Sequence, residues 1–148
     1  MSVFGSFDIS SSGMTAQRTR TDLIAQNIAN ANSTRDADGN IYRRKTVVFE
    51  EKSYVTFEDS LITAAGTGTT TKGVKINRIV EDMSEGAKVY DPSHPDADEE
   101  GYVTYPNVNI VEEMTNMIDA SRAYEANVTA LNASKSMIMR ALDLGKGV

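Results

Sequence analysis

The sequence predicts an α+β protein in which long N- and C-terminal helices flank a small β-rich middle. Three observations carry this prediction. Residues 108–144 contain neither glycine nor proline, and their apolar side chains recur at alternating three- and four-residue intervals, as in an amphipathic helix. Residues 6–31 show a similar recurrence. The segment between them is rich in β-branched and aromatic residues, which favours short strands.

Composition excludes many classes of enzyme and partner. The chain has 148 residues, 15 basic and 21 acidic side chains, a net charge of −6, no cysteine and one histidine, His94. Disulfides, thiol nucleophiles and cysteine-ligated metals are therefore impossible, as are sites that need two imidazoles. The acidic balance disfavours nucleic acid and acidic membranes as partners. No apolar run approaches the roughly 18 residues of a membrane-spanning helix.

The N-terminus does not read as a cleaved secretory signal. Such a signal needs a basic start and then about seven or more apolar residues. The first ten residues lack lysine and arginine and are interrupted by Gly5, Ser6 and Asp8. We therefore expect a cytoplasmic chain or one exported by a route that does not cleave it.

The N-terminal helix is predicted over residues 6–31. Its recurring apolar positions include Phe7, Met14, Ile24 and Ile28. Gly13 lowers its intrinsic helicity by about 1 kcal/mol relative to alanine. Since an isolated helix draws most of its stability from packing, we expect it to fold only against the C-terminal helix and other subunits.

Five strands are predicted in the middle, over residues 41–51, 53–57, 74–80, 88–90 and 102–105. A stretch rich in glycine and threonine, residues 64–73, is predicted to be a flexible loop. In the first strand, Arg43, Arg44 and Lys45 alternate between two faces. We therefore expect them to pair with acidic side chains rather than to share an anion site.

The C-terminal helix has a predicted start, a stop and a heptad repeat. Asn109 can cap its first turn, Glu112 stands at the capping-box spacing, and Gly145 ends it. The seam of the repeat comprises Ile110, Met114, Met117, Tyr124, Val128, Leu131, Ile138 and Leu142. About 35 residues give a helix of roughly 52 Å, longer than the roughly 40 Å diameter of a compact chain of this size. Other subunits are therefore expected to cover the seam as a coiled coil, although an alanine-rich helical hairpin is an alternative.

Two loop motifs resemble ligand sites but depart from them. In residues 68–73 the lysine precedes the second glycine, whereas a phosphate loop has it afterwards. Residues 96–101 match the first half of a calcium loop, but Asn107 stands where a bidentate glutamate belongs. An acidic surface turn is the preferred interpretation, and a calcium-binding or enzymatic domain is the alternative. His94 lies in the same loop without an evident nucleophile. We predict no enzyme activity, no cofactor and no metal.

Several blocks together resemble bacterial flagellar rod and hook proteins, and among them those of the proximal rod. The first is an asparagine-rich corner followed by a tyrosine, namely Asn27, Asn30, Asn32 and Tyr42. The others are residues 80–82, 90–102, 106–114 (with Asn107 and Asn109) and 121–127, all in the family's order. The alternative within this family is another rod or hook subunit, against which the 94–101 loop and the lack of a large inserted domain argue.

The resemblance implies a fold and a function. Residues 1–34 and 107–148 would form an inner coiled-coil domain facing the axis of a tubular polymer, and residues 35–106 a small outer β domain. The chain would be a structural subunit of the proximal rod, which transmits motor torque to the hook and is required for motility. It would pass the flagellar type III export gate and assemble in the periplasm with itself, other proximal and distal rod proteins and a rod-base adaptor. Neither nucleic acid nor an integral membrane position is implied.

Overall fold

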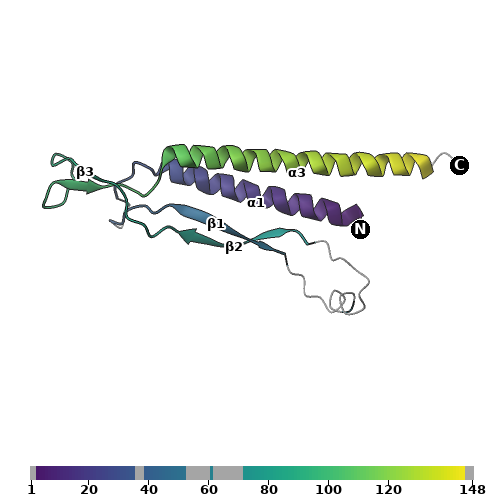
Figure 1. Cartoon of the computed structure of the whole chain (residues 1–148), viewed down its shortest axis with the longest axis horizontal. Coiled ribbons are helices and arrows are strands. Elements are labelled where there is room, and N and C mark those ends of the chain that lie inside the picture. Colours follow the sequence, from purple (N-terminus) through teal and green to yellow (C-terminus); the bar gives the residue numbers. More distant parts are fainter. Residues whose placement is uncertain (1–2, 36–38, 53–60, 62–71, 146–148) are drawn as a thin grey trace. The chain divides into compact units, whose positions relative to one another are not determined.

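The computed structural model describes residues 3–35, 39–52, 61 and 72–145. Its elements in chain order are α1 (Val3–Ala29), β1 (Lys45–Glu51), β2 (Val74–Glu81), β3 (Lys88–Tyr90), β4 (Tyr102–Thr104) and α3 (Ile110–Gly145) (Figure 1). Two terminal helices thus flank a middle of short strands in the chain order, and the predicted α+β class is confirmed. None of the described helices has the length and apolar character needed to cross a membrane.

The start of α3 is capped as the sequence predicts. The side-chain oxygen of Asn109 accepts the backbone N–H groups of Val111 at 3.1 Å and Glu112 at 3.4 Å. This satisfies donors that the first turn of a helix cannot pair internally. The carboxylate of Glu112 lies 3.0 Å from the guanidinium of Arg44. Glu112 therefore forms an ion pair instead of the return hydrogen bond of a capping box.

Asn30 caps the C-terminal end of α1. Its backbone N–H and its side-chain amide both donate to the carbonyl of Gln26, at 3.1 and 2.9 Å. Ser33 then donates through its hydroxyl to the Asn30 side-chain oxygen at 3.3 Å. Among the described residues, positive φ angles occur only at Gly39 and Gly101. The helix therefore ends through local side-chain bonds without a left-handed asparagine.

The described strands form two two-stranded sheets, β1 with β2 and β3 with β4. The second sheet is antiparallel, with Lys88 opposite Thr104 and Tyr90 opposite Tyr102. The predictions for residues 74–80, 88–90 and 102–105 agree with β2, β3 and β4 to within one residue. The predicted strand 53–57 and nearly all of the predicted loop 64–73 lie outside the described residues.

The first strand is shorter than predicted, because β1 begins at Lys45 and not at Ile41. The backbone N–H of Arg44 donates to the side chain of Asn107 at 2.9 Å, and that of Lys45 donates to Asn27 at 3.0 Å. Side chains from distant segments thus take amide hydrogens that a strand would offer to its neighbour.

The chain divides into two compact units. The first comprises residues 1–18, 49–77 and 121–148, and the second comprises residues 19–48 and 78–120. Each unit contains part of both helices. The proposed division into an inner domain (1–34 and 107–148) and an outer domain (35–106) concerns the assembled rod and stays a prediction.

In the first unit, α1 approaches both α3 and the start of β2 closely. A Cβ added to Gly13 would lie 2.8 Å from the side-chain oxygen of Asn127 on α3, so glycine permits this contact. The hydroxyl of Ser12 donates to the carbonyl of Ile9 at 2.7 Å and accepts the backbone N–H of Val74 at 3.1 Å. Small and polar side chains therefore hold this unit together.

In the second unit, the buried hydrophobic residues are Leu23, Ile24, Ala31, Val103 and Ala120. The two helices are linked across this core by Arg20, which donates to the side chain of Asn116 at 3.3 Å. The core is small, and two polar side chains, Asn27 and Glu113, are buried as deeply as its apolar members.

Candidate functional site

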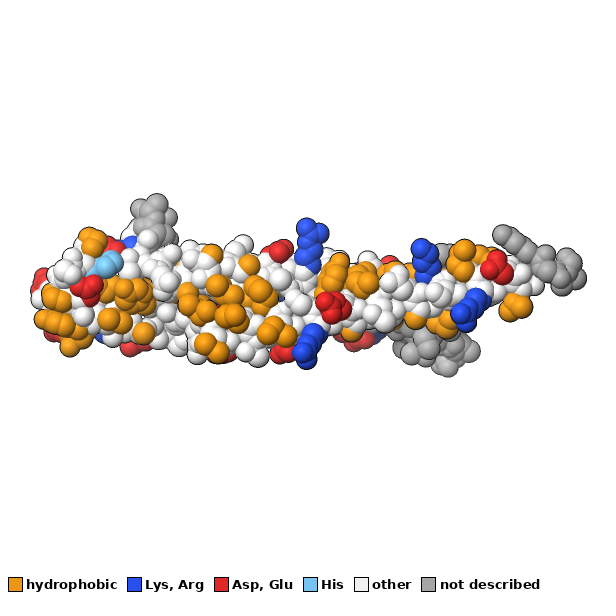
Figure 2. Space-filling model, turned by 90° about the horizontal axis from the view of Figure 1, so that it is seen from above, with side chains coloured by type: hydrophobic (Ala, Val, Ile, Leu, Met, Phe, Trp, Pro, Cys, Tyr) orange, Lys and Arg blue, Asp and Glu red, His pale blue; other side chains and the backbone are white. Residues whose placement is uncertain are grey.

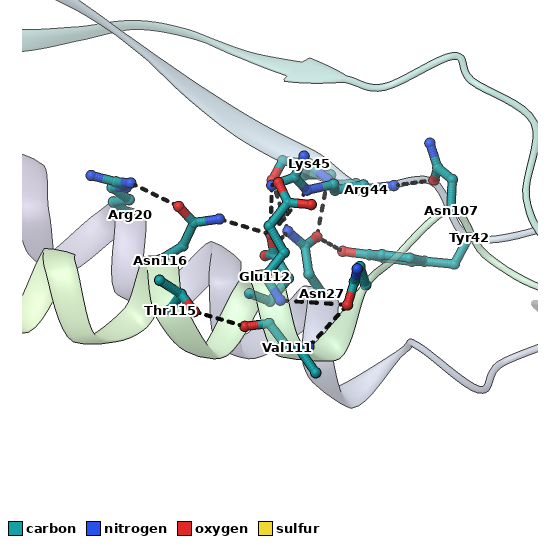
Figure 3. Close-up of polar contacts among 12 residues, drawn as sticks. Arg20, Asn27, Tyr42, Arg44, Lys45, Asn107, Val111, Glu112, Thr115 and Asn116 are labelled. Atoms are coloured by element: carbon teal, nitrogen blue, oxygen red, sulfur yellow. Dashed lines mark hydrogen bonds and ion pairs between the residues drawn. The ribbon is translucent and has the colours of Figure 1, made fainter.

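A buried polar cluster lies in the second unit, where α1, the start of β1 and the first turns of α3 meet (Figure 3). We define it as Asn27, Tyr42, Arg44, Asn107 and Glu113. Asn27 and Glu113 are each only 1% exposed and, with Val103, are the largest fully buried side chains among the described residues. Buried polar groups are costly unless they are paired, so their partners decide what the cluster does.

Asn27 uses the full hydrogen-bonding capacity of its amide. Its nitrogen donates to the carbonyl of Lys45 at 2.9 Å and to the carboxylate of Glu113 at 2.7 Å. Its oxygen accepts from the hydroxyl of Tyr42 at 2.9 Å and from the backbone N–H of Lys45 at 3.0 Å. A side-chain amide offers two donors and an acceptor with two lone pairs. Asn27 therefore joins α1, β1 and α3 at one point.

Glu113 pairs with Arg44 inside this cluster. One carboxylate oxygen accepts from Nε of Arg44 at 2.9 Å and from Nη2 at 2.7 Å. The Glu113 side chain is 2% exposed and that of Arg44 is 21% exposed. Charge-assisted bonds of this geometry are strong, and removing one partner of a buried pair leaves the other charge uncompensated.

Asn107 fixes the same backbone from another direction. It accepts the N–H of Arg44 and donates to the carbonyl of Asp82 at 3.0 Å and the hydroxyl of Ser84 at 2.9 Å. The N–H of Asp82 in turn donates to the carbonyl of Arg44 at 2.8 Å. The chain at Arg44 is therefore held by its side chain, its N–H and its carbonyl.

The surroundings set the protonation of two members. Burial raises the pKa of the Tyr42 phenol, and the negative charges of Glu113 and Glu81 raise it further. Burial alone would lower the pKa of Arg44, but its hydrogen bond to Glu113 and the charges of Glu113, Glu112 and Asp82 raise it. At neutral pH, Tyr42 is thus a neutral donor and Arg44 a cation. The cluster holds backbone and charge in place.

The remaining predicted motif residues have separate positions. Asn30 lies at the end of α1, Asn109 caps the start of α3, and Asn32 is exposed just beyond α1. The predicted pairing of the basic triplet is confirmed for Arg44 and for Lys45, whose Nζ lies 3.7 Å from Glu81. It is wrong for Arg43, which donates to the sulfur of Met83 at 3.2 Å and has no carboxylate partner among the described residues. Glu113 was not predicted from the sequence, because it is the second of two adjacent glutamates in the first turn of a helix, where acidic residues are common.

The predicted seam residues divide into buried and exposed sets. Ile24 is buried, and Phe7, Met14, Ile28, Met117, Val128, Leu131 and Ile138 are partly buried. Ile110, Met114, Tyr124 and Leu142 are between 40% and 56% exposed. Figure 2, which looks onto the α3 side, shows hydrophobic side chains at the surface of this face. That other subunits cover them stays a prediction.

The carboxylates of the acidic loop, residues 94–101, bind donors of their own chain. Asp96 accepts from the hydroxyl of Thr34 at 2.6 Å, and Asp98 accepts the N–H groups of Glu100 at 3.0 Å and Tyr102 at 2.8 Å. His94 accepts the N–H of Asp96 at 3.1 Å. Within the described ranges, no three His, Asp or Glu side chains are grouped to hold a metal ion.

Comparison with known families gives the class of protein. A family model described as "Flagella basal body rod protein" matches residues 7–35, which include Asn27. A second, described as "Flagellar basal body rod FlgEFG protein C-terminal", matches residues 99–144, which include Asn107 and Glu113. Both ends of the chain, and hence both helices that supply the buried cluster, are those of a flagellar rod protein.

Whole-chain relatives narrow the class to one family. The chain is 44% identical over 152 residues to the flagellar basal-body rod protein FlgC of Bacillus subtilis (strain 168), covering 99% of this chain and 100% of the relative. The FlgC proteins of Borreliella burgdorferi and Salmonella typhimurium (strain LT2) are 43% and 40% identical at the same coverage. The chain belongs to the FlgC family, and the predicted resemblance is confirmed. It is a structural protein of the flagellar basal-body rod.

Proposed function

We propose that this chain polymerises into the proximal part of the flagellar rod and there transmits motor torque to the hook. It reaches this position through the flagellar type III export gate and assembles in the periplasmic space. Its partners are further copies of itself and other proximal and distal rod proteins, including a rod-base adaptor. It has no catalytic role, and motility depends on it.

The observation that carries the proposal is the exposed apolar part of the α3 seam. Ile110, Met114, Tyr124 and Leu142 leave 40–56% of their surface uncovered by their own chain. Burying the remaining exposed surface of one such large apolar side chain stabilises the contact between subunits by roughly 1 kcal/mol. Four such residues in every subunit favour a polymer in which each copy covers its neighbours.

The buried polar cluster supports a role in transmitting torque. A charged, hydrogen-bonded link between α1, β1 and α3 resists relative displacement of these elements more than apolar contacts alone, because its bonds are directional. In the proposed rod, torque received by the helices would pass through Asn27, Arg44 and Glu113 to the strands.

The test uses cells that lack this chain, complemented with variants of it. Basal bodies are purified and inspected by electron microscopy, and exported subunit is measured by immunoblot. Met114→Asp and Tyr124→Asp should leave the subunit exported but stop rod growth. Asn132→Asp, an exposed polar position on the same helix, is the matched control and should assemble normally.

Two results would contradict the proposal. The first is normal swimming by cells without the chain. The second is normal rods in both aspartate variants, because a charge placed in a buried seam has to prevent association.

A further inference from the structure

A hollow open to solvent lies in the second unit beside the buried cluster. Its apolar lining comes from Ile41, Tyr42, Met83 and Tyr105, and its edge carries the cations Arg43 and Lys88. Ile41 is 38% exposed and Met83 is 74% exposed. Large apolar side chains at this exposure, next to uncompensated charge, are typical of a surface that binds a partner.

In the part of the chain that the structure describes, the two cations have no carboxylate partner within ion-pair distance. Nη1 of Arg43 donates to the sulfur of Met83 at 3.2 Å. Glu85 also lines the hollow, which leaves two positive charges against one negative charge. The hollow therefore favours an apolar group accompanied by an anion.

The hollow has a defined backbone wall. The N–H of Tyr105 donates to the carbonyl of Ala87 at 2.8 Å. A Cβ added to Gly86 would overlap the carbonyl oxygen of Tyr105, so glycine is required for this close approach. Because the wall is hydrogen-bonded backbone, the hollow is preformed and does not depend on the binding of an occupant.

The C-terminal end of α3 has the complementary chemistry. Leu142 and Leu144 are 56% and 80% exposed and flank Asp143. The last turn carries no basic residue, although the C-terminal end of a helix favours cations and disfavours anions. Within the described part of the chain Asp143 has no ion-pair partner, so a cationic site on another molecule would relieve an unfavourable charge.

We propose that this hollow receives the C-terminal end of α3 from a second copy of the chain. Leu144 would enter between Ile41 and Met83, and Asp143 would pair with Arg43 and Lys88. The two surfaces differ, so the contact is heterologous, and a heterologous contact whose rotation does not close repeats from copy to copy along a helix, as the proposed polymer requires. This inference rests on the proposed function, whose subunit contacts it specifies.

The test is a mixed cross-linking experiment in purified basal bodies. The chain has no cysteine, so introduced thiols are the sole sites in this protein. One tagged copy carries Met83→Cys and a differently tagged copy carries Leu144→Cys. Both positions are highly exposed, so folding should be unaffected. Mild oxidation should give a dimer that carries both tags, because disulfides form only between residues whose Cα atoms lie about 4–7 Å apart.

The matched control pairs Met83→Cys with Met137→Cys. Met137 is 64% exposed on the same helix but lies seven residues, or about 10 Å, from Leu144. It should give no dimer. Equal cross-linking of both pairs, or no cross-linking while both tagged copies are present in basal bodies, would overturn the inference and leave the proposed function standing. A cross-linked product with a different rod protein would also overturn it.

Absence of the wild-type chain from basal bodies would contradict both the proposed function and this inference.

A second experiment exchanges the charges of the proposed ion pair. Asp143→Lys and Lys88→Glu should each weaken the contact about two- to fivefold, as expected for an accessible ion pair. The double variant should recover part of this loss, and additive losses in the double variant would contradict the assigned pairing.

Discussion

Asn27→Ala removes the amide that joins three elements at the buried cluster. Its four hydrogen bonds are lost, and the carboxylate of Glu113 loses a donor at 2.7 Å in a site that water scarcely reaches. A bond to a charged group contributes about 2 kcal/mol, and each of the three bonds to Tyr42 and Lys45 contributes about 0.5–1 kcal/mol. We therefore expect a loss of about 3–5 kcal/mol, against a total stability of about 5–15 kcal/mol for a domain.

The assay is urea unfolding of the purified chain followed by far-ultraviolet circular dichroism. With a slope of about 2 kcal/mol per molar urea, the midpoint should fall by about 2 M. Asn30→Ala is the matched control, since its side chain bonds locally to Gln26 and Ser33 at the surface and should change stability by about 0.5 kcal/mol at most.

Asn27→Asp separates the loss of bonds from the loss of packing. This variant keeps the shape of the side chain but sets a carboxylate oxygen against that of Glu113, where the amide nitrogen now lies at 2.7 Å. Its stability should be lowest at neutral pH and should partly recover on mild acidification, as one of the two carboxylates is protonated. If Asn27→Ala matches Asn30→Ala to within about 1 kcal/mol, the central role of Asn27 is wrong.

Three further changes test other parts of the structure. The pKa of Tyr42 lies above its ordinary value of 10.0, so the unfolded chain loses this proton first and stability falls as the pH rises past 10.0; Tyr42→Phe should flatten the pH dependence of the unfolding free energy there, and an unchanged slope would refute this. Gly86→Ala should lower stability by about 1–3 kcal/mol through overlap with Tyr105, measured by thermal unfolding. Gly145→Ala, whose Cβ would meet nothing within 4 Å, should not change stability. Equal losses of stability in Gly86→Ala and Gly145→Ala would contradict the close approach of Gly86 to Tyr105. Asn109→Ala should cost about 1 kcal/mol and speed hydrogen exchange at the first turn of α3; unchanged exchange would show that the cap is dispensable.

The helices could be predicted because their determinants are local and repeated. Residues 110–144, which follow the capping Asn109 and precede Gly145, carry recurring apolar side chains without glycine or proline, and α3 spans Ile110–Gly145. The short strands β3 and β4 were predicted within one residue, because alternating aromatic and β-branched residues stand between turn-forming residues.

The start of β1 could not be predicted from local pattern. Residues 41–44 have strand composition, but Asn27 and Asn107 take the N–H groups of Lys45 and Arg44. These asparagines lie 18 and 63 residues away in sequence. A rule that reads neighbouring residues carries no information about such donors and acceptors.

The buried side of α3 also could not be predicted from the recurrence of large apolar residues. In the second unit Glu113 and Ala120 are its buried residues, so the face toward α1 is made from a charge and a small side chain. A search for large apolar residues therefore follows the neighbouring row, whose members Ile110 and Met114 are exposed in the single chain. The positions of Arg44 and Asn27 in space explain why a glutamate can be buried there.

A density map of the intact basal body at side-chain resolution would show directly whether this chain forms the proximal rod and what covers its α3 seam. This chain should lie in the proximal rod, with Ile110, Met114, Tyr124 and Leu142 buried against neighbouring subunits. Asn27 should remain bonded to Glu113 within each copy. A rod in which these four side chains face water, or which lacks this chain, would refute the proposed function.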